Sequence, residues 1–207
     1  EAVSRAVSGS QCEAVTVVGS AGVGKSRLVS EVIADLNERM PDVRVYRGAA
    51  RSDTGVHGAI TRILRARFNL QEGTDEHTQA NEVCAQVMDL FGDRRVDEIL
   101  HFLGGFLGFR AGQTVLVDAF RDDPRAFQHV ARVVLRRLFE VDAQRAPLVL
   151  VFEDIHLANV EGLRMLAELT GSFHGSPITV LCTARPELLA RMHDFCAHPA
   201  GRHRRIE

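Results

Sequence analysis

Residues 19–26, which read Gly19-Ser20-Ala21-Gly22-Val23-Gly24-Lys25-Ser26, constrain the fold of this chain more than any other segment. They follow residues 14–18 (AVTVV), a β-branched apolar run that predicts a buried strand. They precede residues 26–39, whose apolar side chains recur at helical spacing. Glycines between a strand and a helix let backbone N–H groups turn inward around an anion, and the helix N-terminus adds positive partial charge. The segment therefore predicts a phosphate-binding loop of the G-x-x-x-x-G-K-[ST] type.

Lys25 is the only lysine among 25 basic residues, the others being arginine. A compact ammonium differs from a guanidinium wherever a point charge must fit a tight space. We expect Lys25 to face solvent when no ligand is bound and to reach the β- and γ-phosphates of a nucleotide. We expect the Ser26 hydroxyl to coordinate Mg²⁺, and the residues of the loop together with Arg27 to line the nucleotide site.

Two later apolar runs predict strands that are covered on both faces. Residues 148–152 (LVLVF) are followed by Glu153 and Asp154, and residues 178–182 (ITVLC) are followed closely by Arg185. Two carboxylates at a strand tip suit a site where one holds the hydration shell of Mg²⁺ and the other orients a water molecule. A guanidinium at the tip of the other strand suits contact with a γ-phosphate.

The remaining pattern alternates strands and helices. A strand is expected over residues 43–46, and helices over residues 57–68, 75–91, 95–109, 124–142, 160–170 and 186–195. The polar, basic tail, residues 198–207, is expected to be poorly ordered. The whole predicts an α/β, three-layer P-loop NTPase fold, with a mainly parallel sheet and helices on both faces. Right-handed crossovers then bring the carboxyl ends of the strands to one ligand-binding edge.

Composition excludes several other classes of protein. The formal net charge of −2 argues against a dedicated nucleic-acid binder, and the apolar run over residues 99–109 is too short to span a bilayer. Cys12, Cys84, Cys182 and Cys196 are scattered without a CxxC pair, which favours free thiols in a reducing cytoplasm. The chain shows no export signal and begins at Glu1, so we expect one ATPase domain, residues 1–207, cut from a larger protein.

His193, Cys196 and His198 invite comparison with a metal site. Zinc sites show paired ligands at tighter, repeated spacing, so a solvated tail is the favoured interpretation.

Three segments in this order, GSAGVGKSRLVSEV, LVLVFEDIHLAN and ITVLCTARPELL, resemble the AAA-like ATPase domain of bacterial STAND-type signalling proteins. The resemblance covers roughly residues 10–195. In that family the domain sits beside a Ser/Thr kinase, a nucleotide cyclase or a LuxR-type DNA-binding output. The acidic motif of the family usually reads ED-x-H-W-A-D, and here Leu157 and Asn159 replace its tryptophan and last acid.

The resemblance implies roles for individual residues. Glu153 would hold Mg²⁺ through water, Asp154 would be the catalytic or water-orienting acid, and His156 would sense the γ-phosphate. Lys25 and Arg185 would complete the catalytic set, and the strand over residues 178–182 would lie between the other two motif-bearing strands. The order of the two acids is the reverse of that in motor ATPases, and a shorter second acid is consistent with slow turnover.

The expected function is therefore a switch that binds ATP or ADP with Mg²⁺, hydrolyses ATP slowly, and acts on output domains of the same polypeptide. Oligomerisation in the ATP state is left open, and neither a membrane nor a nucleic acid is an expected partner. A P-loop kinase for a small metabolite is one alternative, although nothing marks an acceptor pocket or a basic lid. An AAA+ initiator-type DNA-replication ATPase is another, although it would show the opposite order of acids. No N-K-x-D motif is present, which disfavours GTP.

Overall fold

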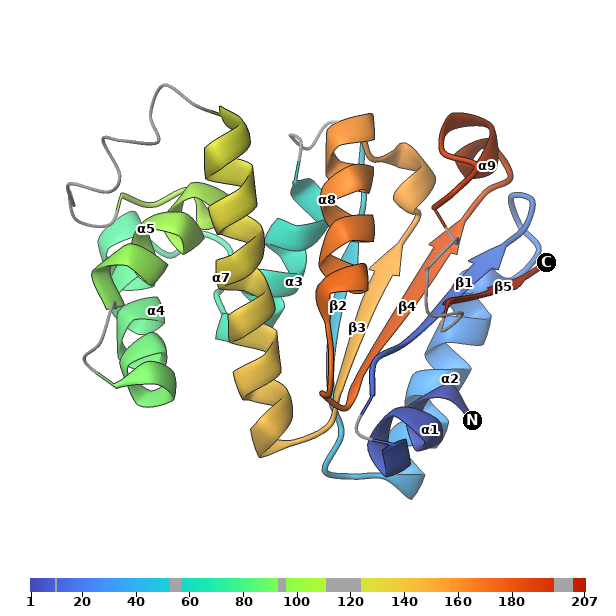
Figure 1. Cartoon of the computed structure of the whole chain (residues 1–207), viewed down its shortest axis with the longest axis horizontal. Helices are drawn as coiled ribbons and strands as arrows, with labels where there is room; N and C mark the ends of the chain where they lie inside the picture. The colour runs from blue at the N-terminus through green and yellow to red at the C-terminus, as the bar shows by residue number, and fades with distance from the viewer. Residues whose placement is uncertain (10, 53–56, 93–95, 111–123, 196–202) are drawn as a thin grey trace.

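A computed structural model of the chain describes residues 1–9, 11–52, 57–92, 96–110, 124–195 and 203–207. Within these residues one parallel sheet has the strand order β2-β3-β4-β1-β5 (Figure 1). The strands are β1 (Glu13–Val18), β2 (Arg44–Ala49), β3 (Leu148–Glu153), β4 (Ile178–Ala184) and β5 (His203–Ile206). The predicted α/β fold is confirmed, and β4 lies between β1 and β3 as the resemblance implied.

The central strand β3 is buried along its whole length, as its uninterrupted apolar sequence predicts. Because side chains alternate along a strand, Leu150 and Phe152 join the larger hydrophobic cluster on one face of the sheet. Val149 and Val151 point to the other face, where they pack in a smaller cluster with Val29 of α2 (Lys25–Arg39). The same alternation shows on which face of the sheet each residue at the end of β3 lies.

Helices cover both faces of the sheet (Figure 1). The face that carries α2 also carries the short helix α1 (Ala2–Gly9). The opposite face carries α3 (Gly58–Phe68), α7 (Pro124–Arg145) and α8 (Val160–Ser172). Beyond α3 and α7, α4 (Glu76–Phe91) and α5 (Val96–Leu107) extend the molecule sideways, away from the sheet.

A buried ion pair joins α3 to α7 beneath this lateral extension. Arg67 donates from Nε and Nη2 to the carboxylate of Asp142, at 2.7 and 2.8 Å. The Asp142 side chain is fully buried, and that of Arg67 is 6% exposed. The Arg67 guanidinium also lies 4.3 Å from the centre of the Phe68 ring and donates to Gln86 of α4. The pair therefore links three helices, with both charges neutralised and hydrogen-bonded.

Three differences from the sequence-based expectations concern elements. Residues 203–206 were expected to be poorly ordered but form β5, which pairs with β1 and brings His203 Nε2 within 2.7 Å of Thr16 Oγ1. The helix expected over residues 186–195 is only the five-residue α9 (Glu187–Arg191). The helix α1 was not expected at all. A polar edge strand depends on its partner rather than on its own apolar pattern, which is why local periodicity missed β5.

Candidate functional site

The glycine loop begins where β1 ends. The Gly19 amide donates to the carbonyl of Ala184 at 3.1 Å, which ties the start of the loop to the end of β4. Gly22 and Gly24 have φ values of +78° and +97°, a left-handed backbone that residues with a Cβ rarely adopt. The loop conformation therefore requires glycine at these two positions.

Lys25 is folded back over this loop. Its Nζ donates to the carbonyls of Gly19 and Ser20, at 2.8 and 2.9 Å, and the residue is only 9% exposed. The expectation of a solvent-facing lysine is therefore wrong. An ammonium has three donors, and two carbonyls of the loop are close enough to satisfy two of them. A phosphate group would have to offer the ammonium better acceptors than these carbonyls.

The N-terminus of α2 suits an anion. Gly24 stands at the N-cap position and offers no side-chain acceptor, and no acidic residue lies in the first turn. The first amides of the helix therefore lack the usual side-chain cap, and their partial positive charge points toward the exposed loop. Ser26, in this first turn, is exposed with its hydroxyl on the same helix end.

The acidic strand end is built around Glu153, which is buried. Arg47 of β2 engages both carboxylate oxygens of Glu153: Nη2 donates to Oε1 at 2.9 Å and Nε donates to Oε2. This hydrogen bonding raises the pKa of Arg47 above its ordinary value. Arg47 was not predicted as a site residue, because it lies just beyond the strand expected over residues 43–46, whereas β2 extends to Ala49. The pairing of β2 with β3 could not be known from the sequence.

Asp154 follows in a left-handed conformation, with φ of 51°. Its amide donates to the Thr183 hydroxyl of β4 at 3.1 Å, so this turn is tied to the neighbouring strand. The turn ends β3 and starts the single 3-10 turn η1 (Ile155–Leu157).

His156 lies in η1 and is 8% exposed. Neither nitrogen of its ring has a hydrogen-bond partner within the described part of the chain. Desolvation lowers the pKa of His156 below its ordinary value; the negative charge of Asp154 partly offsets this shift, and the positive charge of Arg185 adds to it. The imidazole is therefore neutral near pH 7, with one donor and one acceptor unused.

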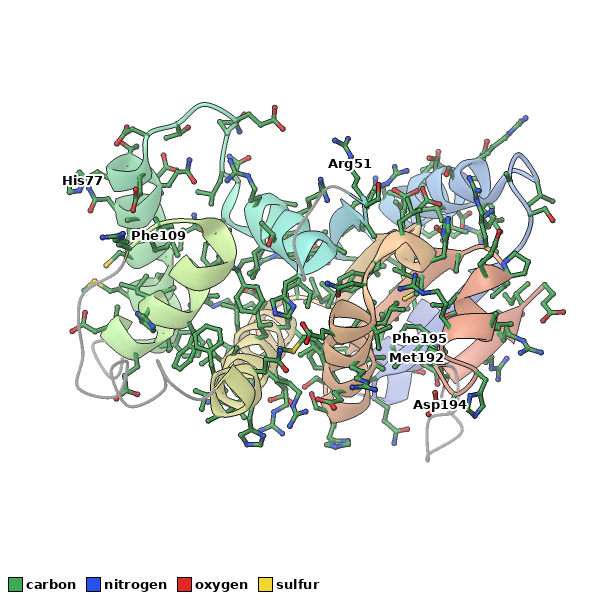
Figure 2. All side chains as sticks on the ribbon, turned by 90° about the horizontal axis from the view of Figure 1, so that it is seen from above. Arg51, His77, Phe109, Met192, Asp194 and Phe195 are labelled. Atoms are coloured by element: carbon green, nitrogen blue, oxygen red, sulfur yellow. The ribbon has the colours of Figure 1, made fainter. Side chains whose placement is uncertain are left out.

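Four charged side chains lie near enough to His156 to act electrostatically on its ring: Asp154, Arg185, Glu187 and Lys25. Three of these are predicted site residues, so they and His156 share one region at the carboxyl edge of the sheet. Arg185 is exposed there. Arg191 of α9, which the sequence analysis did not select, donates to the carbonyls of His156 and Ala158 at 2.6 and 2.8 Å. Figure 2 looks onto this edge, with Met192 and Phe195 marking the chain just after α9.

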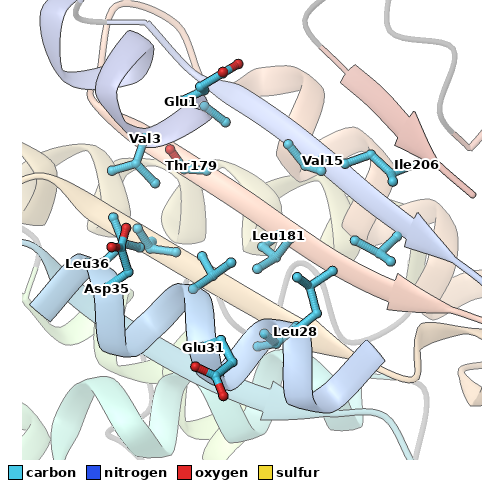
Figure 3. A pocket seen from close by; sticks show the side chains of 15 residues that line it. Glu1, Val3, Val15, Leu28, Glu31, Asp35, Leu36, Thr179, Leu181 and Ile206 are labelled. Carbon is cyan, nitrogen blue, oxygen red and sulfur yellow. The ribbon is translucent and has the colours of Figure 1, made fainter. Parts of the chain in front are cut away.

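A separate cavity of about 470 Å³ lies on the sheet face covered by α1 and α2 (Figure 3). Its floor is apolar, with Val15, Leu28, Leu181 and Ile206 among the lining residues. Such a lining does not suit a polyphosphate, because moving an ionised group out of water without a partner costs a large amount of free energy. The candidate nucleotide site is therefore the glycine loop and not this cavity.

The described residues fit a magnesium–nucleotide complex. They contain no group of three or more His, Cys, Asp or Glu side chains that could hold a metal without help, and Cys196 and His198 lie outside them. Mg²⁺ typically takes one or two protein ligands together with waters and substrate phosphates. A serine hydroxyl at the loop and a carboxylate at the strand end are donors of that kind.

A glycine loop that leads into an uncapped helix, together with two acids at the carboxyl edge of the same parallel sheet, defines a P-loop NTPase. Residues 1–181 match the sequence model of the AAA ATPase domain, and the chain belongs to that family. It is also 25% identical, over 193 residues, to the uncharacterized protein R02095 of Rhizobium meliloti (strain 1021). That match covers 89% of this chain and 17% of the relative's length. None of the helices within the described residues is long and apolar enough to cross a bilayer.

Proposed function

We propose that this chain, residues 1–207, is one ATP-binding domain of a longer signalling protein, and that it acts as a slowly hydrolysing switch. The observation that carries the proposal is the glycine loop, where the Lys25 ammonium lies against the loop carbonyls next to the uncapped first turn of α2. The resemblance to STAND-type ATPase domains supports the signalling role. In this proposal the nucleotide state controls output domains of the same polypeptide, and oligomerisation in the ATP state is one form that this control can take.

Each residue of the site has a part in binding. The amides of residues 19–27 surround the phosphates, and Lys25 exchanges its two loop carbonyls for the β- and γ-phosphate oxygens. Ser26 and Glu153 would hold Mg²⁺, which would supply positive charge against the phosphates.

A second set of residues acts on the reaction. Asp154 orients a water molecule and accepts its proton, and Arg185 stabilises the charge that develops on the γ-phosphate. His156 offers an unused ring donor from a buried position, which suits sensing of the γ-phosphate. Slow turnover is expected from the short second acid and from the engagement of Arg191 by the carbonyls of His156 and Ala158.

Replacement of Lys25 by alanine tests this function. We expect Lys25→Ala to weaken binding of a fluorescent ATP analogue with Mg²⁺ by at least about tenfold, because a charge-assisted contact to phosphate is lost. The matched control is Arg39→Ala at the far end of α2, where the side chain makes only an exposed pair with Asp35. Thermal unfolding of both variants checks that the fold survives. An unchanged affinity in Lys25→Ala would show that the loop is not the phosphate site.

A phosphate-release assay then separates the switch from the alternatives. The switch is expected to release phosphate slowly and only when Lys25 is present. Rapid transfer of phosphate to a small-molecule acceptor would favour the kinase alternative instead.

A further inference from the structure

The contact between Arg47 and Glu153 follows from the register of two strands. In the pairing of β2 with β3, Ala49 lies opposite Glu153 and Arg47 lies opposite Val151. Arg47 and Glu153 therefore point to the same face of the sheet, one diagonal step apart. The methyl group of Ala49 leaves room for the long Arg47 side chain to run along the sheet to the carboxylate.

This face of the sheet is the one that carries the glycine-loop helix. Val149 and Val151 precede Glu153 with the same alternation, and they pack with Val29 of α2. The Glu153 carboxylate thus projects from the end of β3 on the side where α2 and its loop lie. Arg47 reaches this carboxylate from the edge strand β2, whereas the glycine loop follows β1, on the other side of β3 in the sheet.

Arg47 uses both oxygens of this carboxylate. A guanidinium that donates from Nε and Nη2 forms two parallel charge-assisted hydrogen bonds. The Glu153 side chain is 9% exposed, whereas that of Arg47 is 43% exposed. The Arg47 side chain therefore has solvent to move into, whereas the Glu153 carboxylate is enclosed at the strand end.

From this geometry we infer that Arg47 acts as a latch on Glu153: the two side chains stay paired until a magnesium nucleotide binds, and then they separate. The inference rests on the proposed function, because it takes Glu153 as the metal-binding acid. Mg²⁺ and the guanidinium compete for one negative charge, and two cations that share it repel each other. Binding of the magnesium nucleotide therefore releases Arg47, and the signal reaches the edge strand β2. Arg47 acts through Glu153 and is a positioning residue.

The test measures how strongly nucleotide binding depends on Mg²⁺. In Arg47→Leu, the concentration of Mg²⁺ that half-saturates binding of a fluorescent ATP analogue is expected to fall about fivefold, which is typical of one partly exposed charge pair. Affinity for the analogue in EDTA is expected to stay unchanged. The matched control is Arg44→Leu, in the same strand but on its other face, and it is expected to leave both quantities unchanged.

Two further variants guard against a loss of folding in Arg47→Leu. Arg47→Lys keeps the positive charge but cannot form the two-pronged contact, so it is expected to give a smaller shift in the same direction. In a Glu153→Gln background, Arg47→Leu is expected to cause no shift, because the contested charge is gone.

The outcomes separate the latch from the proposed function. If the wild-type chain binds the analogue in a manner that depends on Lys25 and Mg²⁺, but neither Arg47 variant lowers the Mg²⁺ requirement, the latch is overturned and the proposed function stands. A higher Mg²⁺ requirement in folded Arg47→Leu would likewise overturn it, since the arginine would then assist the metal. If the wild-type chain does not bind nucleotide through Lys25, both inferences fail.

Discussion

At two candidate site residues, Asp154 and Lys25, the backbone matters as much as the type of side chain. Asp154 has φ of 51°, in a region where most residues with a Cβ are strained but aspartate and asparagine are tolerated. Lys25 is held by two carbonyls of its own loop. In both cases the local backbone determines which substitutions test the function and which merely disturb the fold.

Asp154→Asn tests the proposed role of Asp154 as the water-orienting acid. Asparagine keeps the left-handed backbone but cannot accept a proton, so ATP binding is expected to persist while hydrolysis falls about 100-fold or more. Equilibrium binding and steady-state phosphate release measure the two effects separately. Asp154→Ala serves as the strain control, with an expected loss of about 1 kcal/mol in the free energy of unfolding. Hydrolysis at the wild-type rate in Asp154→Asn would mean that another group orients the water.

Histidines also make the stability of the fold depend on pH. Burial lowers the pKa of His57, whose Nδ1 has no partner among the described residues and whose ring lies 5.2 Å from that of Phe106. The unfolded chain therefore binds more protons than the folded chain below the ordinary histidine pKa of about 6.5. Stability is fully present above that value and is lost as the pH falls through it.

The midpoint of urea unfolding is accordingly expected to fall between pH 7.5 and pH 5.5. Because His57→Leu removes one of the titrating groups, its midpoint should fall less over the same range. Equal falls in the two proteins would show that His57 does not contribute to the pH dependence.

At the scale of elements, contacts between helices and strands hold both the site and the lateral helices. Arg191 connects α9 to η1 and so joins the segment after Arg185 to the turn that carries His156. Arg67 and Asp142 join α3 to α7, where no solvent reaches the aspartate. Hydrogen-bonded arginines therefore connect elements that are far apart in the sequence.

The buried pair of Arg67 and Asp142 gives the stability prediction at this scale. Arg67→Met leaves a buried carboxylate without its partner and is expected to lower the free energy of unfolding by about 3–5 kcal/mol. The matched control is Arg145→Met, which breaks the exposed pair with Asp89 and is expected to cost less than about 1 kcal/mol. Urea unfolding of both variants measures the difference, and equal effects would contradict the assigned role of burial.

How far the sequence predicts this molecule depends on whether a feature is local. The glycine loop, Glu153, Asp154 and Arg185 are adjacent to strong apolar runs, so motif and periodicity were enough to select them as candidates. Arg47 and β5 depend on which strands pair and in which register, and no local pattern carries that information. The prediction that Lys25 faces solvent was wrong because its partners are backbone carbonyls. Every residue has such a carbonyl, so the sequence does not indicate which of them a side chain will contact.

Across the whole molecule, positive charge is carried almost entirely by arginine. The chain has 25 basic and 27 acidic residues, and 24 of the basic residues are arginine. Many of these arginines pair with carboxylates on neighbouring turns or elements, as with Arg5, Arg39, Arg132 and Arg145. The one ammonium side chain, that of Lys25, is thus set apart both by its chemistry and by its place at the start of α2.

Amine chemistry on this protein should consequently report on a single site. Apart from the α-amino group, the only amine for an acylating reagent is that of Lys25; this residue is 9% exposed, and its ammonium donates to two carbonyls. Acetylation of Lys25 is expected to be slower than that of a lysine in an unstructured peptide, and to slow further when a magnesium nucleotide occupies the loop. Mass spectrometry of the peptide containing Lys25 measures both rates without background from other lysines. Modification as fast as in the free peptide would contradict the folded-back lysine, whereas protection by nucleotide would make Lys25 a built-in footprinting probe.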